Sequence, residues 1–223
     1  MNLDQQRREN KGLNSQLRDN LKSIQKRISK ALSKSFHPNR NVTLIAVSKK
    51  QPLEKMEALS HPGLRWHFIG GLQTNKARYV PGKFSLVHSV DSAKLARALH
   101  NKAKSLDIVQ PVLVQVNLAG ESQKSGAAKQ DLPELAEVIL ELSHLRLEGL
   151  MLMPPFFDDP EKARPYFAGM RMLGRSLEHS LGVRLPHLSM GMSGDFEVAV
   201  EEGSTMVRIG ESLFGPRPGG KLT

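Results

Sequence analysis

One lysine of this sequence stands where covalent chemistry with a carbonyl compound is feasible. Residues 43–47 are apolar and rich in branched side chains, which predicts a buried strand, and Ser48 and Lys49 follow where that strand ends. A lysine amine is a nucleophile only when it is deprotonated, and partial burial lowers its pKa toward that state. Lys49 is therefore a candidate for Schiff-base formation, with an ordinary surface lysine beyond a strand as the alternative.

Two segments near the C-terminus have the composition of an anion-binding site. Residues 190–195 place the Ser193 hydroxyl in a glycine-containing loop ahead of a predicted short helix, whose free N–H groups favour a phosphate. Arg208, in the predicted last strand, provides a fixed positive charge, and Gly210 permits close approach of the backbone. Each segment alone is also explained by a turn or a salt bridge. Combined with Lys49, they describe a phosphate anchor opposite a reactive amine.

The order of the predicted elements indicates how these segments come together. Strands alternate with helices, which predicts a parallel sheet with right-handed crossovers. So many units in one domain favour an α/β fold of the single-domain (β/α)8 TIM-type barrel class, whose strands present the active face at their carboxyl ends. We expect strands at 43–47, 64–70, 84–88, 111–118, 145–153, 188–195 (running into a loop) and 205–209, and helices at 13–34, 53–59, 92–106, 132–142 (with Asp131 as N-cap), 160–181 and 196–202.

The composition fits one globular domain and excludes several kinds of chemistry. The 223 residues are 39% hydrophobic and 24% charged, and the absence of cysteine excludes disulfides and thiolate catalysis. The N-terminus lacks the apolar core of a signal peptide, and no apolar run approaches the roughly 20 residues of a membrane span. We therefore expect a cytoplasmic protein without membrane contact. No histidine lies at metal-ligand spacing from the paired acids, so we predict no metal site.

The N-terminal segment carries most of the positive charge. Residues 1–52 hold 12 Lys and Arg against 3 Asp and Glu, so they account for nearly all of the formal net charge of +10. A basic segment of this kind could attract nucleic acid or another anionic surface. However, its apolar residues recur at helical spacing over 13–34, which favours a helix packed on the core with a solvated basic face that includes Lys22, Lys26, Arg27 and Lys30. We therefore do not expect nucleic-acid binding.

Six stretches of the sequence resemble those of one protein family. The chain resembles the pyridoxal phosphate homeostasis proteins, which are related to the barrel domain of alanine racemase. The matching stretches follow the family's order and are LIAVSKKQP (44–52), WHFIGGLQTNKARYV (66–80), VHSVDSAKLARAL (87–99), VQVNLAGESQKSG (114–126), LEGLMLMPP (147–155) and LSMGMSGDFEVAVEEGSTMVRIGESLFGPR (188–217).

The resemblance implies that pyridoxal 5'-phosphate is the cofactor and that Lys49 holds it as a Schiff base. Ser193 and the backbone near Ile209 and Gly210 would bind its phosphate. Arg208 would lie near the pyridine nitrogen, and a cation there keeps that nitrogen unprotonated and weakens the ring as an electron sink. These roles fit a carrier better than a transaminase.

His67 is a further candidate for the cofactor pocket. It lies in the matching stretch 66–80 and would face the pocket, with a satisfied core histidine as the alternative. The resemblance also exposes one departure. Family members carry a longer segment between the lysine strand and WHFIG, containing a Phe-Gly-Glu-Asn-Tyr string, whereas here only residues 53–65 connect them. The second barrel strand is therefore expected to be shortened or missing, which would expose the edges of the sheet.

The expected organisation is a helix over 1–34 packed on the barrel, a pyridoxal phosphate-binding barrel over 42–217, and a loose tail over 218–223. The resemblance implies a non-catalytic protein of vitamin B6 homeostasis that buffers the cofactor or delivers it, with pyridoxal phosphate-dependent apoenzymes as candidate recipients. We expect a monomer, because the related racemases and decarboxylases dimerise with the help of an additional C-terminal domain. The alternatives are an amino-acid racemase that uses Lys49 as one base, and a basic module that binds RNA or another anion.

Overall fold

The chain alternates between helices and strands. The computed structural model describes residues 3–49, 51, 55–56, 65–121 and 125–216. In chain order the elements are α1 (Leu3–Leu32), β1 (Thr43–Ala46), β2 (His67–Phe68), η1 (Thr74–Tyr79), β3 (Leu86–Val90), α3 (Ala93–Ser105), β4 (Gln110–Asn117), β5 (Ala127–Ala128), η2 (Lys129–Asp131), α4 (Leu132–Glu141), β6 (Leu145–Leu152), η3 (Pro160–Ala163), α5 (Arg164–Leu181), β7 (His187–Met192), α6 (Phe196–Glu201), β8 (Met206–Ile209) and α7 (Glu211–Phe214), where η marks a 3-10 helix.

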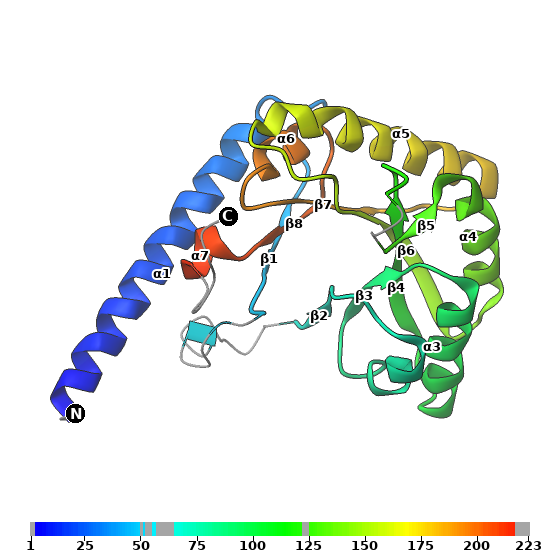
Figure 1. Cartoon of the computed structure of the whole chain (residues 1–223), viewed down its shortest axis with the longest axis horizontal. Coiled ribbons are helices and arrows are strands. Elements are labelled where there is room, and N and C mark those ends of the chain that lie inside the picture. Colours follow the sequence, from blue (N-terminus) through cyan, green and yellow to red (C-terminus); the bar gives the residue numbers. More distant parts are fainter. Residues whose placement is uncertain (1–2, 50, 52–54, 57–64, 122–124, 217–223) are drawn as a thin grey trace.

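The strands form one parallel sheet that curls into a nearly closed barrel. Their order is β1-β8-β7-β6-β4-β3-β2, and the short β5 pairs with the end of β4. The sheet is open between β1 and β2, which form its two free edges (Figure 1). Between these two strands the described residues contain no further strand. The expected single-domain parallel barrel is therefore confirmed, and its second strand is not found among the described residues.

Side chains inside the barrel form an apolar floor beneath a polar layer. Successive residues of a strand point to opposite faces, so the residue two positions further on lies on the same face, nearer the carboxyl end. His88, Gln115 and Arg208 stand in this relation to Leu86, Leu113 and Met206 of the floor. The floor consists of Leu86, Leu113, Met151 and Met206, with Ile45 packed against them, and the polar layer of His88, Gln115, Ser189 and Arg208, all of them buried.

Helix α1 packs on the outside of the barrel against α6 and α7. Leu17, Ile24 and Ile28 are buried there, as the helical spacing of apolar residues predicts. On the basic side, Lys22, Lys26 and Lys30 are exposed. Arg27 differs from them because its guanidinium pairs with Glu197 at 2.6 Å and stacks on the ring of Phe196, 4.5 Å from the ring centre.

Three of the expected elements differ in detail. The strand expected at 64–70 is reduced to His67–Phe68, because β2 has a partner on one side only. The helix expected at 160–181 is split into η3 and α5, with Pro165 in the first turn of α5, where its missing N–H is tolerated. Asp131 makes no side-chain cap, because it already has helical backbone angles at the end of η2. Most of the helix expected at 53–59, and the tail at 218–223, lie outside the described residues.

Gly149 permits the close contact between β6 and β7. It has φ +151° and lies where the register between β4 and β6 shifts, next to Glu148. A side chain at this position would overlap the main-chain carbonyl of His187, its neighbour on β7. The inner strands of the barrel therefore require a glycine here.

Replacing Gly149 by alanine should destabilise the protein by more than about 3 kcal/mol, because strain and a backbone clash act together. Urea unfolding followed by circular dichroism measures the change. Gly182→Ala is the matched control: Gly182 ends α5 at φ +64°, and nothing lies within 4 Å of a Cβ there. Its substitution should cost only about 1 kcal/mol. Equal losses in the two variants would contradict this role of Gly149.

Candidate functional site

A cavity of about 1520 Å³ occupies the inside of the barrel. It exceeds the roughly 300–1,000 Å³ of a typical small-molecule pocket. The cavity extends from the N-terminal ends of the strands, near Thr43 and Ser85, to their carboxyl ends. At the carboxyl ends its wall includes Lys49, Asn117, Met153, Ser193, Arg208 and Gly210.

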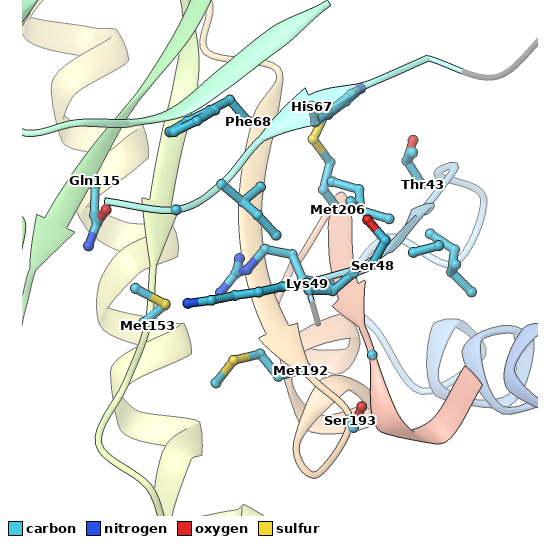
Figure 2. A pocket seen from close by; sticks show the side chains of 18 of the residues that line it. Thr43, Ser48, Lys49, His67, Phe68, Gln115, Met153, Met192, Ser193 and Met206 are labelled. Atoms are coloured by element: carbon cyan, nitrogen blue, oxygen red, sulfur yellow. The ribbon is translucent and has the colours of Figure 1, made fainter. Parts of the chain in front are cut away.

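Lys49 reaches this cavity because β1 pairs with β8. Ile45 lies opposite Arg208, and the N–H of Val47 donates to the carbonyl of Ile209 at 2.8 Å, so the chain enters the mouth of the barrel two residues before Lys49. Figure 2 shows the Lys49 side chain extending into the cavity, whose wall also includes Met153. The expected partial burial is not found: Lys49 is exposed, because it follows an edge strand with a neighbour on one side only.

The loops after β7 and β8 meet at Ser193. The Ser193 Oγ atom accepts a hydrogen bond from the backbone N–H of Ser212 at 3.4 Å, and Asp195 closes the first loop by accepting from the N–H of Met192 at 2.6 Å. Gly210 lines the cavity beside them. Ile209 does not line it, because its buried side chain packs outward in the cluster with α1. The backbone contact expected of Ile209 therefore stays a prediction.

Arg208 places a positive charge in the wall of the cavity. Its side chain is buried; its Nη1 donates to Ser189 Oγ at 2.9 Å and its Nη2 to the carbonyl of Leu152 at 2.8 Å. Burial lowers the pKa of Arg208 to about 10, opposed by the negative charge of Asp195, so the guanidinium stays charged at neutral pH. Among the described residues no carboxylate forms an ion pair with it within 4.0 Å. The site therefore suits an anionic ligand.

Two histidines connect Arg208 to the open side of the barrel. His67 lines the cavity from β2, and its Nδ1 lies 3.0 Å from Nε2 of His88, whose Nδ1 lies 2.9 Å from Ser189 Oγ. Burial, together with the charges of His67 and Arg208, lowers the pKa of His88 to about 2. Burial also lowers the pKa of His67, with His187 adding to the effect. Both rings are therefore neutral at pH 7.

The sequence places His88 at the end of the predicted strand 84–88, on the active face of the expected barrel but with no assigned role, and it indicates no role for Ser189. Each has a sequence signal: His88 follows Leu86 by two positions in an apolar strand, and Ser189 alternates with Leu188 and Met190. A polar residue on the inward face of a barrel strand must find a hydrogen-bond partner. The identity of that partner depends on the neighbouring strands, which the sequence does not show.

Comparison with known proteins assigns the chain to a family. The alanine racemase N-terminal domain family matches residues 15–218. A pyridoxal phosphate homeostasis protein of Aquifex aeolicus is 52% identical over 165 residues, which cover 74% of this chain and 72% of the relative. Another, of Pseudomonas aeruginosa, is 38% identical over 226 residues, covering 91% and 96% of the two chains. The chain belongs to the pyridoxal phosphate homeostasis protein family.

A solved structure of a similar protein has the same fold as this chain. PipY of Synechococcus elongatus, crystallised with pyridoxal phosphate bound, superimposes with a TM-score of 0.72 at 32% identity and covers 84% of this chain and 100% of its own. The alignment with the Pseudomonas relative runs over 226 positions, more than the 223 residues of this chain, yet includes only 91% of them. This chain therefore lacks residues that the family member has.

Two features are absent from the described part of the chain. No helix there is both long enough and apolar enough to span a bilayer. Over the same residues, no group of three or more His, Asp or Glu side chains is arranged to hold a metal ion.

The buried His88 should make stability depend on pH. The folded protein keeps His88 neutral down to about pH 2, whereas the unfolded chain takes up the proton near pH 6.5. The unfolding free energy should therefore fall by about 1.4 kcal/mol per pH unit as the pH decreases below about 6.5. Urea unfolding at several pH values between about 8 and 5 measures this slope. His88→Gln, which cannot titrate, should lose the His88 share of the slope; an unchanged slope would contradict the assignment.

Proposed function

We propose that this protein binds pyridoxal 5'-phosphate without turning over a substrate, and that Lys49 holds the cofactor covalently. The observation that carries the proposal is the placement of Lys49, Ser193 and Arg208 on the wall of one cavity. The names of the relatives and the pyridoxal phosphate bound in PipY support the same ligand. Binding of this kind would serve vitamin B6 homeostasis inside the cell.

The residues present fit this cofactor. Pyridoxal phosphate supplies an aldehyde that condenses with a lysine amine and a ring that accepts electron density. Lys49 would provide the amine, while Ser193 and the backbone around Gly210 would bind the phosphate. Nothing lies within 4 Å of a Cβ at Gly194, so there is room for an anion beside Ser193. The buried charge of Arg208, unpaired among the described residues, would face the ring and weaken its electron-accepting power.

The tyrosines of this chain do not supply a second acid or base to the cavity. The sequence contains two tyrosines, and neither lines the cavity. Tyr79 is 55% exposed on η1, and Tyr166 stacks against Phe157, with ring centres 5.8 Å apart. A racemase needs a second group opposite the lysine to move a proton on the other face of the substrate. Neither tyrosine is placed for this second role, and the names of the relatives favour the holding role over the racemase alternative. We propose the holding role for a monomer that transfers the cofactor to apoenzymes.

Lys49 should be the residue that attaches the cofactor. The purified protein mixed with pyridoxal phosphate should develop a visible absorbance band, and borohydride reduction followed by peptide mapping should locate the label on Lys49. Lys49→Ala should lose the band and the specific label. Lys94→Ala, at an exposed position of α3, should behave as the wild type. Label spread over many surface lysines in the wild type would refute the proposal.

Ser193 should recognise the phosphate rather than the ring. Ser193→Ala removes a hydroxyl that would bond the phosphate, so its affinity for pyridoxal phosphate should fall about tenfold. Its affinity for pyridoxal, which has no phosphate, should stay within about twofold of the wild type. Fluorescence titration with both compounds measures the two affinities. An equal loss for both would place the phosphate elsewhere.

A further inference from the structure

Four side chains form a continuous row through the polar layer of the barrel. They are Arg208, Ser189, His88 and His67, from β8, β7, β3 and β2, and successive polar atoms lie 2.9, 2.9 and 3.0 Å apart. Ser189 and His88 are 0% exposed, and Arg208 is 4% exposed. Every proton in the interior of this row must therefore find its acceptor inside the protein.

The chemistry of Arg208 sets the direction of the row. A guanidinium only donates, so Ser189 Oγ accepts from it. The one acceptor that the structure gives for the Ser189 hydroxyl proton is Nδ1 of His88. The reverse arrangement would leave that proton buried without an acceptor, at a cost of about 1–3 kcal/mol. The hydroxyl therefore donates to Nδ1, and a neutral His88 carries its proton on Nε2.

The hydrogen bond between His88 and His67 runs in the same direction. His88 Nε2 is a donor, so Nδ1 of His67 accepts from it at 3.0 Å, and the neutral His67 ring also carries its proton on Nε2. We propose that Ser189, His88 and His67 are positioning residues that hold Arg208 in place through a hydrogen-bond chain of fixed direction. The part of this proposal that concerns the cofactor rests on the proposed function, in which Arg208 faces the cofactor ring.

The hydrogen-bond chain depends on His67 being neutral. A proton added at Nδ1 of His67 would remove the acceptor that His88 requires, and two N–H groups would then face each other. The charged or titratable groups around the two rings are Arg65, Glu148 of β6, His187 of β7 and Arg208. Of these, Glu148 alone favours protonation of His67, and it is engaged by Arg146 at 2.7 Å. The surrounding groups thus keep Nδ1 of His67 unprotonated, so that it can accept the hydrogen bond from His88.

The direction of the hydrogen bonds in this row can be tested on the whole protein without any ligand. Long-range ¹H–¹⁵N spectra of the ¹⁵N-labelled protein distinguish protonated from unprotonated ring nitrogens, and the variants His88→Gln and His67→Gln assign the signals. Both rings should be protonated on Nε2 and unprotonated on Nδ1. A proton on Nδ1 of either ring would overturn the proposal.

The positioning of Arg208 is tested by removing and restoring one hydroxyl. Ser189→Ala should broaden the side-chain N–H signals of Arg208, weaken pyridoxal phosphate binding about tenfold and shift the absorption maximum of the bound cofactor. Ser189→Thr, which keeps the hydroxyl, should restore all three. His88→Gln, whose amide can accept from Ser189 and donate onward, should also preserve the Arg208 signals, whereas His88→Leu should not.

These readouts separate the two proposals. A wild-type protein that does not bind pyridoxal phosphate would refute the proposed function, while the Arg208 signals in the ligand-free variants would still decide the positioning role. Unchanged Arg208 signals in Ser189→Ala would refute that role even in a protein that binds the cofactor. Sharp signals in the wild type and Ser189→Thr, lost in Ser189→Ala, would support it.

Discussion

The parallel pairing of β1 with β8 is the interaction on which the site depends. It joins residues 43–46 to residues 206–209, from opposite ends of the folded chain. This pairing alone places Lys49 and Gly210 at the same mouth of the barrel. Because the two strands are so far apart in sequence, their contact forms against a large loop-closure entropy. Helix α1 reinforces it by packing on α7, where the Asn20 amide donates to the carbonyl of Leu213 at 2.8 Å.

A buried positive charge determines the organisation of the interior. Burial penalises the charged form of Arg208, so the guanidinium requires hydrogen bonds that only neighbouring strands can supply. Ser189 and the carbonyl of Leu152 provide them from β7 and the end of β6. The apolar floor lies beneath this layer, and His88 completes the layer on the side of β3. The charge and its partners thus form a layer that extends across four strands.

The site residues still come together although the barrel is open on one side. Among the described residues, β1 and β2 each pair with a strand on one side only, and the N–H and C=O groups of such a strand edge require other partners. The remaining pairings, β1-β8-β7-β6-β4-β3, still place the phosphate loops, Arg208 and Lys49 around one cavity. Lys49, which follows the edge strand β1, lines the cavity and is exposed. This exposure makes the Lys49 amine accessible, but it also leaves a cofactor bound there open to water.

The sequence by itself determined the alternation of strands and helices, because apolar runs of strand length and helical periodicity are local signals. It also provided the candidate site residues, of which Lys49, Ser193, Arg208, Gly210 and His67 line one cavity in the structure. The tertiary structure decided what the local pattern could not. The length of β2, the outward packing of the Ile209 side chain and the exposure of Lys49 all follow from which strands are neighbours. The row from Arg208 to His67 likewise exists only in the folded barrel, since each hydrogen bond joins a different pair of strands and no local pattern encodes the partner.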